Sequence, residues 1–164
     1  FMRLIEVKPT PAQKRKATIM AKEMGQLRGS MTKGEGNKAG FIGEICAGQY
    51  LNAEHKNTYQ YDLILPDGHT VDVKTKRCKF KPLMTYDVSI STWNTKQACD
   101  YYVFARTLND YSLVWLLGYM HKEQYFDEAV FKKKGTREGF FTFNSDCWNM
   151  AIKDLKPIKD LLNK

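Results

Sequence analysis

Hydrophobic residues recur at steps of three and four near the start of the chain, at Ala17, Met20, Met24 and Leu27. This spacing puts them on one face of a helix, and charged residues fill much of the remainder. Thr10 is a suitable cap, Pro11 suits the first helical position, and Gly29 is a typical residue for the helix end. The pattern therefore predicts an amphipathic helix between these residues.

A second helix is expected from Lys38 to Ala53, with Asn37 as its cap and Phe41, Ile45 and Leu51 on a common side. Small residues interrupt it at Gly40, Gly43, Ala47 and Gly48. Each glycine lowers helix stability by about 1 kcal/mol, so the series indicates that another element approaches the backbone closely. Glu44 lies one turn from these small residues, so we expect its carboxylate on the close-packed side and not in solvent.

Alternating polar and hydrophobic residues predict strands over 59–65, 69–74 and 86–91, and buried strands over 101–106 and 112–119. A short helix over 94–99 is expected between the third and fourth strands. Residues 139–143 are interpreted as a late strand, and a closing helix capped by Asn144 or Ser145 is expected to carry Trp148, Ile152 and Leu155. The order helix, helix, strands, helix predicts an α/β fold with a mixed central β-sheet flanked by helices.

The segment Pro66-Asp67-Gly68 predicts a three-residue hairpin loop with Gly68 in the left-handed region. Leu65 then pairs with His69, and Asp62 lies opposite Asp72. Lys74, two residues further, projects from the same face as Asp72. The opposite face is expected to be apolar, formed by Leu63, Leu65, Val71 and Val73.

Two directly opposed carboxylates repel each other, whereas a divalent cation between them reverses the sign of the interaction. Mg²⁺ prefers oxygen ligands, which Asp62, Asp72 and the carbonyl of Val73 can supply. Lys74 would then lower the pKa of an attacking water or neutralise charge on a phosphoryl oxygen. The alternative interpretation is a solvated cross-strand salt-bridge set.

Acid-x-Lys tripeptides also occur at residues 6–8, 54–56 and 154–156. None of these combines a strand, an opposed carboxylate and an upstream helical acid. The cysteines at 46, 78, 99 and 147 have no metal-ligand spacing and are interpreted as buried, reduced thiols.

The composition favours a polyanionic partner, because Lys and Arg exceed Asp and Glu by a formal charge of +8 and the sequence pI is near 9.3. A basic run continues out of the proposed site through Lys76, Arg77, Lys79 and Lys81, where it could follow a phosphate backbone. Lys132, Lys133, Lys134 and Arg137 form a second basic cluster. Lys33, in the glycine-rich segment 29–37, could contact phosphates, and Tyr86 and Trp93 could stack on bases.

Glu44 on a helix, Asp62, and then Asp72-Val73-Lys74 after a turn resemble the active-site signature of the PD-(D/E)xK nuclease superfamily, over residues 37–107. The resemblance implies a restriction-endonuclease-like three-layer sandwich and Mg²⁺-dependent hydrolysis of DNA, with Mn²⁺ able to substitute. It assigns metal binding to Asp62 and Asp72, the role of catalytic lysine to Lys74 and the role of helical acid to Glu44.

The sequence departs from the family pattern at two positions. Tyr61 replaces the usual proline, and Asp72 replaces the commoner glutamate. Lys96 or Gln97 could match a polar residue that some members carry after the lysine strand; the alternative is that both are surface residues.

The sequence thus predicts one domain of 164 residues, with an N-terminal helix (1–28), a catalytic core (37–107) and C-terminal strands and helix (108–164). Because the most apolar stretch, 111–120, is about half the ~20 residues that a bilayer crossing needs, we expect a soluble, cytoplasmic protein without a membrane partner. The predicted activity is a DNA endonuclease that depends on Mg²⁺, and a homodimer remains open. The alternatives are a non-catalytic basic nucleic-acid-binding protein with the same fold and a protein-interaction domain.

Overall fold

The computed structural model describes residues 4–27, 37–56, 58–95 and 97–163. The expectations for Gly29, Lys33 and Lys96, and for the side chain of Trp93, lie outside this description. The α-helices are α1 (Pro11–Leu27), α2 (Lys38–Leu51) and α3 (Lys122–Glu128). Short 3-10 helices are η2 (Thr92–Asn94), η3 (Ile152–Asp154) and η4 (Ile158–Asn163). None of the helices in the described ranges is both long enough and apolar enough to cross a bilayer.

A six-stranded mixed sheet forms the centre of the molecule. Its spatial order is β1 (Ile5–Val7), β7 (Val114–His121), β6 (Tyr101–Leu108), β4 (Thr70–Cys78), β3 (Leu63–Ile64) and β2 (Glu54–His55). Strands β4 and β6 are parallel, and the other pairs are antiparallel. The mixed α/β architecture predicted from the sequence is confirmed at this level.

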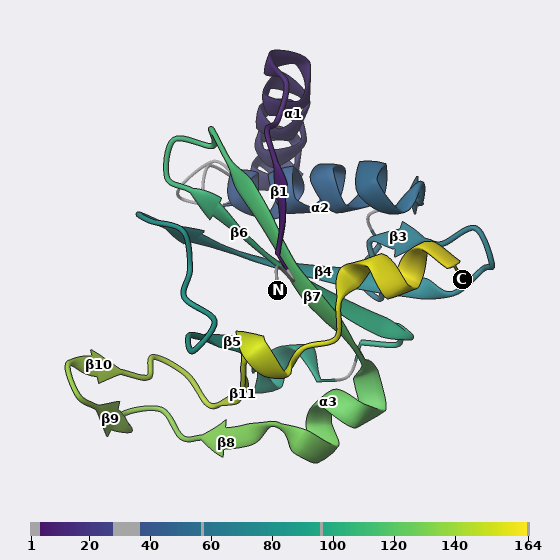
Figure 1. The fold of residues 1–164 in the computed structure, drawn as a ribbon. Coiled ribbons are helices and arrows are strands. Elements are labelled where there is room, and N and C mark those ends of the chain that lie inside the picture. The colour runs from purple at the N-terminus through teal and green to yellow at the C-terminus, as the bar shows by residue number, and fades with distance from the viewer. Residues whose placement is uncertain (1–3, 28–36, 57, 96, 164) are drawn as a thin grey trace.

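Two smaller sheets complete the fold. One has the order β5 (Asp87–Ser91), β11 (Cys147–Ala151) and β8 (Val130–Lys132), and the other is the hairpin of β9 (Arg137–Glu138) and β10 (Phe141–Thr142). Helices α1 and α2 lie on one side of the central sheet, whereas α3 and the three-stranded sheet lie on the other (Figure 1). Two separate cores lie on the two sides of the sheet. Val73 of β4 and Val103 of β6 pack toward α2, while Tyr102 and Phe104 of β6 pack toward α3 and β5.

The predicted start of α1 is confirmed by a reciprocal capping pair. The Gln13 N–H donates to Thr10 Oγ1 at 3.1 Å, and the Thr10 N–H donates to Gln13 Oε1 at 2.9 Å. Helix α2 begins at Lys38 as expected, but the Asn37 side chain makes no capping hydrogen bond. It ends at Leu51, two residues earlier than predicted, because Asn52 adopts a left-handed conformation with φ of 52°.

The predicted hairpin register is confirmed. Leu63 pairs with Val71, and the Leu65 N–H donates to the His69 carbonyl at 2.8 Å. Gly68 has φ of +92°, the left-handed conformation that this loop requires. The apolar face is also as expected, since Leu63, Leu65, Val71 and Val73 all belong to the core under α2. Strand β3 is much shorter than the predicted strand over 59–65, and β4 extends four residues beyond the predicted end.

The prediction of a closing helix over Trp148, Ile152 and Leu155 is wrong. Residues 147–151 form strand β11, in which Trp148 pairs with Ile90 and Phe131. These partners are distant in sequence, so pairing overrides a local spacing that happens to suit a helix. The predicted helix over 94–99 is also wrong, because only η2 precedes an irregular segment there. Strand β5 forms as predicted but lies in the separate three-stranded sheet.

Helix α2 can lie close to the central sheet because it carries Gly43. A Cβ atom at Gly43 would lie 1.8 Å from Oγ1 of Thr75, the residue that follows Lys74 on β4. Gly40, one turn earlier, has no such neighbour within 4 Å. The close approach inferred from the glycine pattern is therefore made by β4, and it brings Glu44 toward the strand that carries Asp72 and Lys74.

We expect Gly43→Ala to lower the free energy of unfolding by about 1–3 kcal/mol, because the added methyl group overlaps Thr75. Gly40→Ala is the matched control: it meets no atom, and we expect it to raise stability by up to about 1 kcal/mol through helix propensity. Urea unfolding followed by circular dichroism measures both. Equal effects of the two substitutions would contradict this account of the α2–β4 contact.

Candidate active site

Three acidic side chains from different elements are buried together beside β4 of the central sheet. Glu44 comes from α2, Asp62 immediately precedes β3, and Asp72 lies in β4; their exposed fractions are 7%, 7% and 3%. Burial, followed by repulsion from Glu44 and Asp72, raises the pKa of Asp62 to about 9. The fold therefore brings together the three acids proposed from the sequence, in surroundings that oppose the ionisation of Asp62 and Glu44.

The position of Asp62 follows from the end of the β3–β4 ladder. Its backbone N–H donates to the Val71 carbonyl at 2.9 Å, and its Oδ2 accepts the Val73 N–H at 2.8 Å. The Asp62 side chain thus accepts a β4 backbone hydrogen bond at the point where the β3–β4 pairing ends. This arrangement fixes the carboxylate against the backbone on either side of Asp72.

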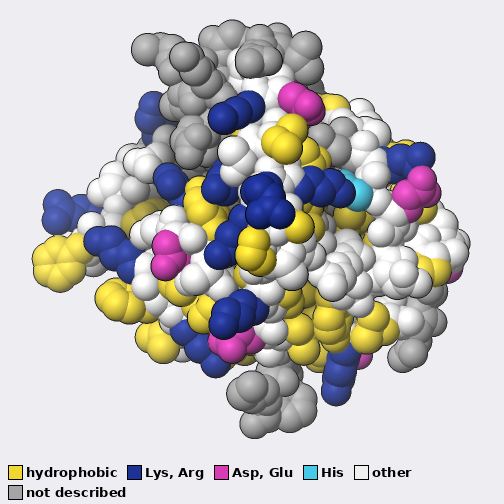
Figure 2. All heavy atoms as spheres, turned by 90° about the horizontal axis from the view of Figure 1, so that it is seen from above, with side chains coloured by type: hydrophobic (Ala, Val, Ile, Leu, Met, Phe, Trp, Pro, Cys, Tyr) yellow, Lys and Arg dark blue, Asp and Glu magenta, His cyan; other side chains and the backbone are white. Residues whose placement is uncertain are grey.

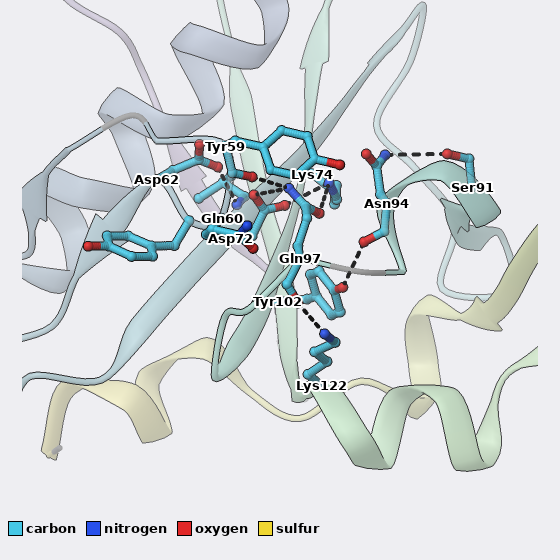
Figure 3. A network of polar contacts seen from close by, with 12 residues as sticks. Tyr59, Gln60, Asp62, Asp72, Lys74, Ser91, Asn94, Gln97, Tyr102 and Lys122 are labelled. Atoms are coloured by element: carbon cyan, nitrogen blue, oxygen red, sulfur yellow. Dashed lines mark hydrogen bonds and ion pairs between the residues drawn. The ribbon is translucent and has the colours of Figure 1, made fainter.

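Asp72 and Lys74 project from the same face of β4, as predicted, and form an ion pair with 2.7 Å between Oδ2 and Nζ. Gln97 connects the two residues: its amide nitrogen donates to Asp72 Oδ1 at 3.0 Å, and its amide oxygen accepts from Lys74 Nζ at 2.9 Å. The same amide nitrogen also donates to the Tyr59 carbonyl at 3.0 Å. Figure 3 shows Gln97 between these partners.

The alternative that Gln97 is a surface residue is wrong, because only 6% of the residue is exposed. It reaches Asp72 and Lys74 from an irregular segment after η2 and not from a helix. Gln97 therefore belongs to the polar network of the site. Its assignment as a contact for nucleic acid stays a prediction.

The sequence analysis missed His55, the partner of Glu44. Nε2 of His55 lies 2.8 Å from Oε1 of Glu44, and His55 is held in place by pairing with Leu63 across β2 and β3. Burial raises the pKa of Glu44, and the contact with His55 opposes that shift. A two-residue strand carries no recognisable alternation, so the only available signal was the position of His55 just after the helix that holds Glu44.

The predicted basic run lies along the end of β4 and beyond it. Lys76, Arg77, Lys79 and Lys81 are exposed, and Nζ of Lys76 lies 5.8 Å from the centre of the Phe141 ring. In the second cluster, Lys132 pairs with Glu138 at 3.1 Å. Figure 2 shows one face on which basic side chains gather near the centre with hydrophobic side chains between them, while acidic side chains are scattered.

All four cysteines are free, and the prediction of buried thiols is confirmed for three of them, at positions 46, 99 and 147, whereas Cys78 is half-buried. Burial raises the pKa of Cys46 to about 12, so this thiol is a weak nucleophile at neutral pH.

The chemistry of the site suits a hard divalent cation. Within the described residues, no three His, Cys, Asp or Glu side chains are already arranged as ligands of one ion. The available donors are nevertheless carboxylate oxygens, the ligands that Mg²⁺ prefers. Oδ2 of Asp72 is buried and makes no hydrogen bond of regular geometry, although Lys74 lies beside it. A cation would also offset the repulsion that raises the pKa of Asp62.

No protein-family model and no curated protein matches this chain.

The raised pKa of Asp62 makes stability depend on pH. An acid whose pKa rises from 3.8 to about 9 on folding holds a proton that the unfolded chain releases, so stability falls as pH rises between these values. The slope is up to about 1.4 kcal/mol per pH unit. In a chelating buffer, we expect Asp62→Asn to unfold at a higher temperature than the wild type, by an amount that grows from pH 5 to pH 8.

Asparagine keeps an acceptor for the Val73 N–H, so this comparison isolates the charge. Asp154→Asn, at an exposed acid in η3, is the control and should follow the wild-type profile. Parallel melting profiles for Asp62→Asn and the wild type across this pH range would contradict the assignment.

Proposed function

We propose that this protein is a Mg²⁺-dependent nuclease that hydrolyses phosphodiester bonds in DNA, with Mn²⁺ able to replace Mg²⁺. The observation that carries the proposal is the burial of Glu44, Asp62 and Asp72 together, with Lys74 held beside Asp72. A bound cation would favour grouping carboxylates in this way, and Lys74 would offer positive charge to an anionic substrate. The layered mixed α/β architecture is compatible with a restriction-endonuclease-like fold.

Glu44, Asp62, Asp72 and the carbonyl of Val73 are the groups that would hold the ion. When bound, the ion would polarise the phosphoryl group and lower the pKa of a water molecule. Lys74 supplies a fixed positive charge that stabilises the negative charge developing on the phosphoryl oxygens. Gln97 positions the Lys74 ammonium group through its amide oxygen, and His55 positions Glu44.

Lys74 also lines a cavity of about 320 Å³, so its side chain is accessible to a ligand although only 20% of it is exposed. The ion pair with Asp72 would have to rearrange when a cation and a phosphate enter. Gln97 is a second polar partner for Lys74, and the Tyr59 carbonyl as well as Asp72 holds its amide group.

A second candidate, a non-catalytic basic nucleic-acid-binding protein, is favoured by one observation. Lys74 already neutralises Asp72 without a metal ion. This candidate predicts that DNA is retained in chelator and that no divalent ion produces cleavage.

We expect Asp72→Asn and Lys74→Met each to reduce Mg²⁺-dependent nicking of supercoiled plasmid by about 100-fold or more, because each removes a charge at the reacting phosphate. The matched control is Asp154→Asn, in the unrelated acid-x-Lys tripeptide at 154–156, which should cut like the wild type. Circular dichroism and melting temperatures establish that each variant is folded. Wild-type cutting by Asp72→Asn would overturn the assignment, whereas DNA binding without cleavage by the wild type would support the second candidate.

A further inference from the structure

Two cations lie opposite each other beyond the candidate active site. Lys76 of β4 is the register partner of Arg106 of β6, on the face of the sheet that also carries Lys74. Like charges in direct opposition destabilise a sheet. Among the described residues, neither Lys76 nor Arg106 takes part in an ion pair. The Lys76–Arg106 pair is therefore a cluster of positive charge, as Glu44, Asp62 and Asp72 are a cluster of acids. A bound anion would stabilise it.

Arg106 is the more constrained of the two, since only 8% of it is exposed. Its Nη2 donates to the backbone carbonyl of Asp87 at 2.9 Å, which leaves other guanidinium donors available. Burial lowers the pKa of Arg106. A buried guanidinium with one backbone acceptor is a typical binding group for phosphate.

These cations line a continuous groove. The cavity of about 320 Å³ that reaches Lys74 is bounded by Lys76 and Arg106, and the adjoining cavity of about 380 Å³ shares both residues. The second cavity continues to a wall that includes Tyr86 and Phe141. We call these two connected cavities the basic groove.

Each cation in the basic groove has an aromatic neighbour. Arg106 lies 5.5 Å from the centre of the Tyr86 ring, and Lys76 lies 5.8 Å from that of Phe141. Tyr86 and Phe141 are 46% and 51% exposed, so their rings are available to a ligand. Cations that follow a backbone, combined with exposed rings, are typical of sites for single-stranded nucleic acid.

The basic groove also contains two acids. Glu138 is paired with Lys132 at 3.1 Å, so its charge is already compensated. The backbone carbonyl of Asp87 is the acceptor for Arg106, and burial raises the pKa of the Asp87 carboxyl group. An acidic peptide and a nucleic-acid strand would both bring negative charge to the cations, but only the nucleic-acid strand also presents flat bases to the exposed rings.

We propose that Lys76 and Arg106 bind a phosphate of an unpaired nucleic-acid strand, and that Tyr86 and Phe141 stack on its bases. Two residues along β4 separate Lys76 from Lys74 by about 6.6 Å, similar to the separation of successive phosphates in an extended strand. Bases within a duplex are stacked on each other and cannot stack on these rings. That the bound strand is a substrate rests on the proposed function. The inference narrows the proposed substrate to DNA with an unpaired region.

The test is equilibrium binding in EDTA, measured by fluorescence anisotropy of labelled 20-nucleotide oligomers at low salt. We expect single-stranded DNA to bind the wild type at least about tenfold more tightly than a duplex of the same sequence. Tyr86→Ala and Phe141→Ala should each weaken single-strand binding by about fivefold or more. Lys76→Gln should weaken it and reduce the slope of log affinity against log salt by about 1.

Two matched variants serve as controls. Phe140→Ala removes a fully exposed ring that does not line the groove, and Lys159→Gln removes an exposed charge in η4; both should bind like the wild type. A strand of abasic deoxyribose phosphate should bind at least about fivefold more weakly than the base-bearing strand.

The inference is overturned if duplex and single strand bind equally, if the abasic strand binds as well as the normal one, or if polyglutamate displaces the strand at equal charge concentration. It is also overturned if the groove variants bind like the controls. Because every measurement is made without divalent ions, a wild type that never cuts plasmid would refute the proposed function and leave the binding result intact. Conversely, plasmid nicking with unchanged binding by the groove variants would refute only the groove.

Discussion

The repulsion among Glu44, Asp62 and Asp72 is the interaction on which the rest of the site depends. Three carboxylates buried within reach of one another are unfavourable unless positive charge or hydrogen-bond donors surround them. The protein provides such groups on every side: an ammonium and an amide beside Asp72, an imidazole beside Glu44, and a backbone N–H at Asp62. The β2–β3–β4 pairing and the contact between α2 and β4 hold these groups in place.

The two faces of the central sheet differ in the side chains that β4 presents on them. On the face that packs against α1 and α2, β4 contributes hydrophobic side chains and one threonine that lies against a glycine. On the other face, the same strand presents Asp72, Lys74 and Lys76 in succession. A strand that alternates in this way can be anchored firmly from one side, while the charges on its other side remain available to a ligand.

The features that the sequence predicted correctly all have local signals. The hairpin register follows from three turn residues, the first helix from its cap, and the packing of Glu44 from neighbouring glycines. His55 could not be predicted, because a two-residue strand has no periodicity. Gln97 was a candidate only by resemblance, and its burial between Asp72 and Lys74 depends on contacts between residues distant in the chain. The predicted closing helix was wrong because long-range pairing of β11 with β5 and β8 determines the conformation of residues 147–151.

The basic groove has walls that belong to different sheets. Lys74, Lys76 and Arg106 come from the central sheet, whereas Tyr86 precedes β5 of the second sheet and Phe141 lies in the β9–β10 hairpin. Residues of the hairpin can therefore change, or the hairpin can lengthen, without altering the strand that carries the acids. For the proposed activity, such a division would let ligand preference diverge during evolution while the acids and Lys74 are inherited unchanged.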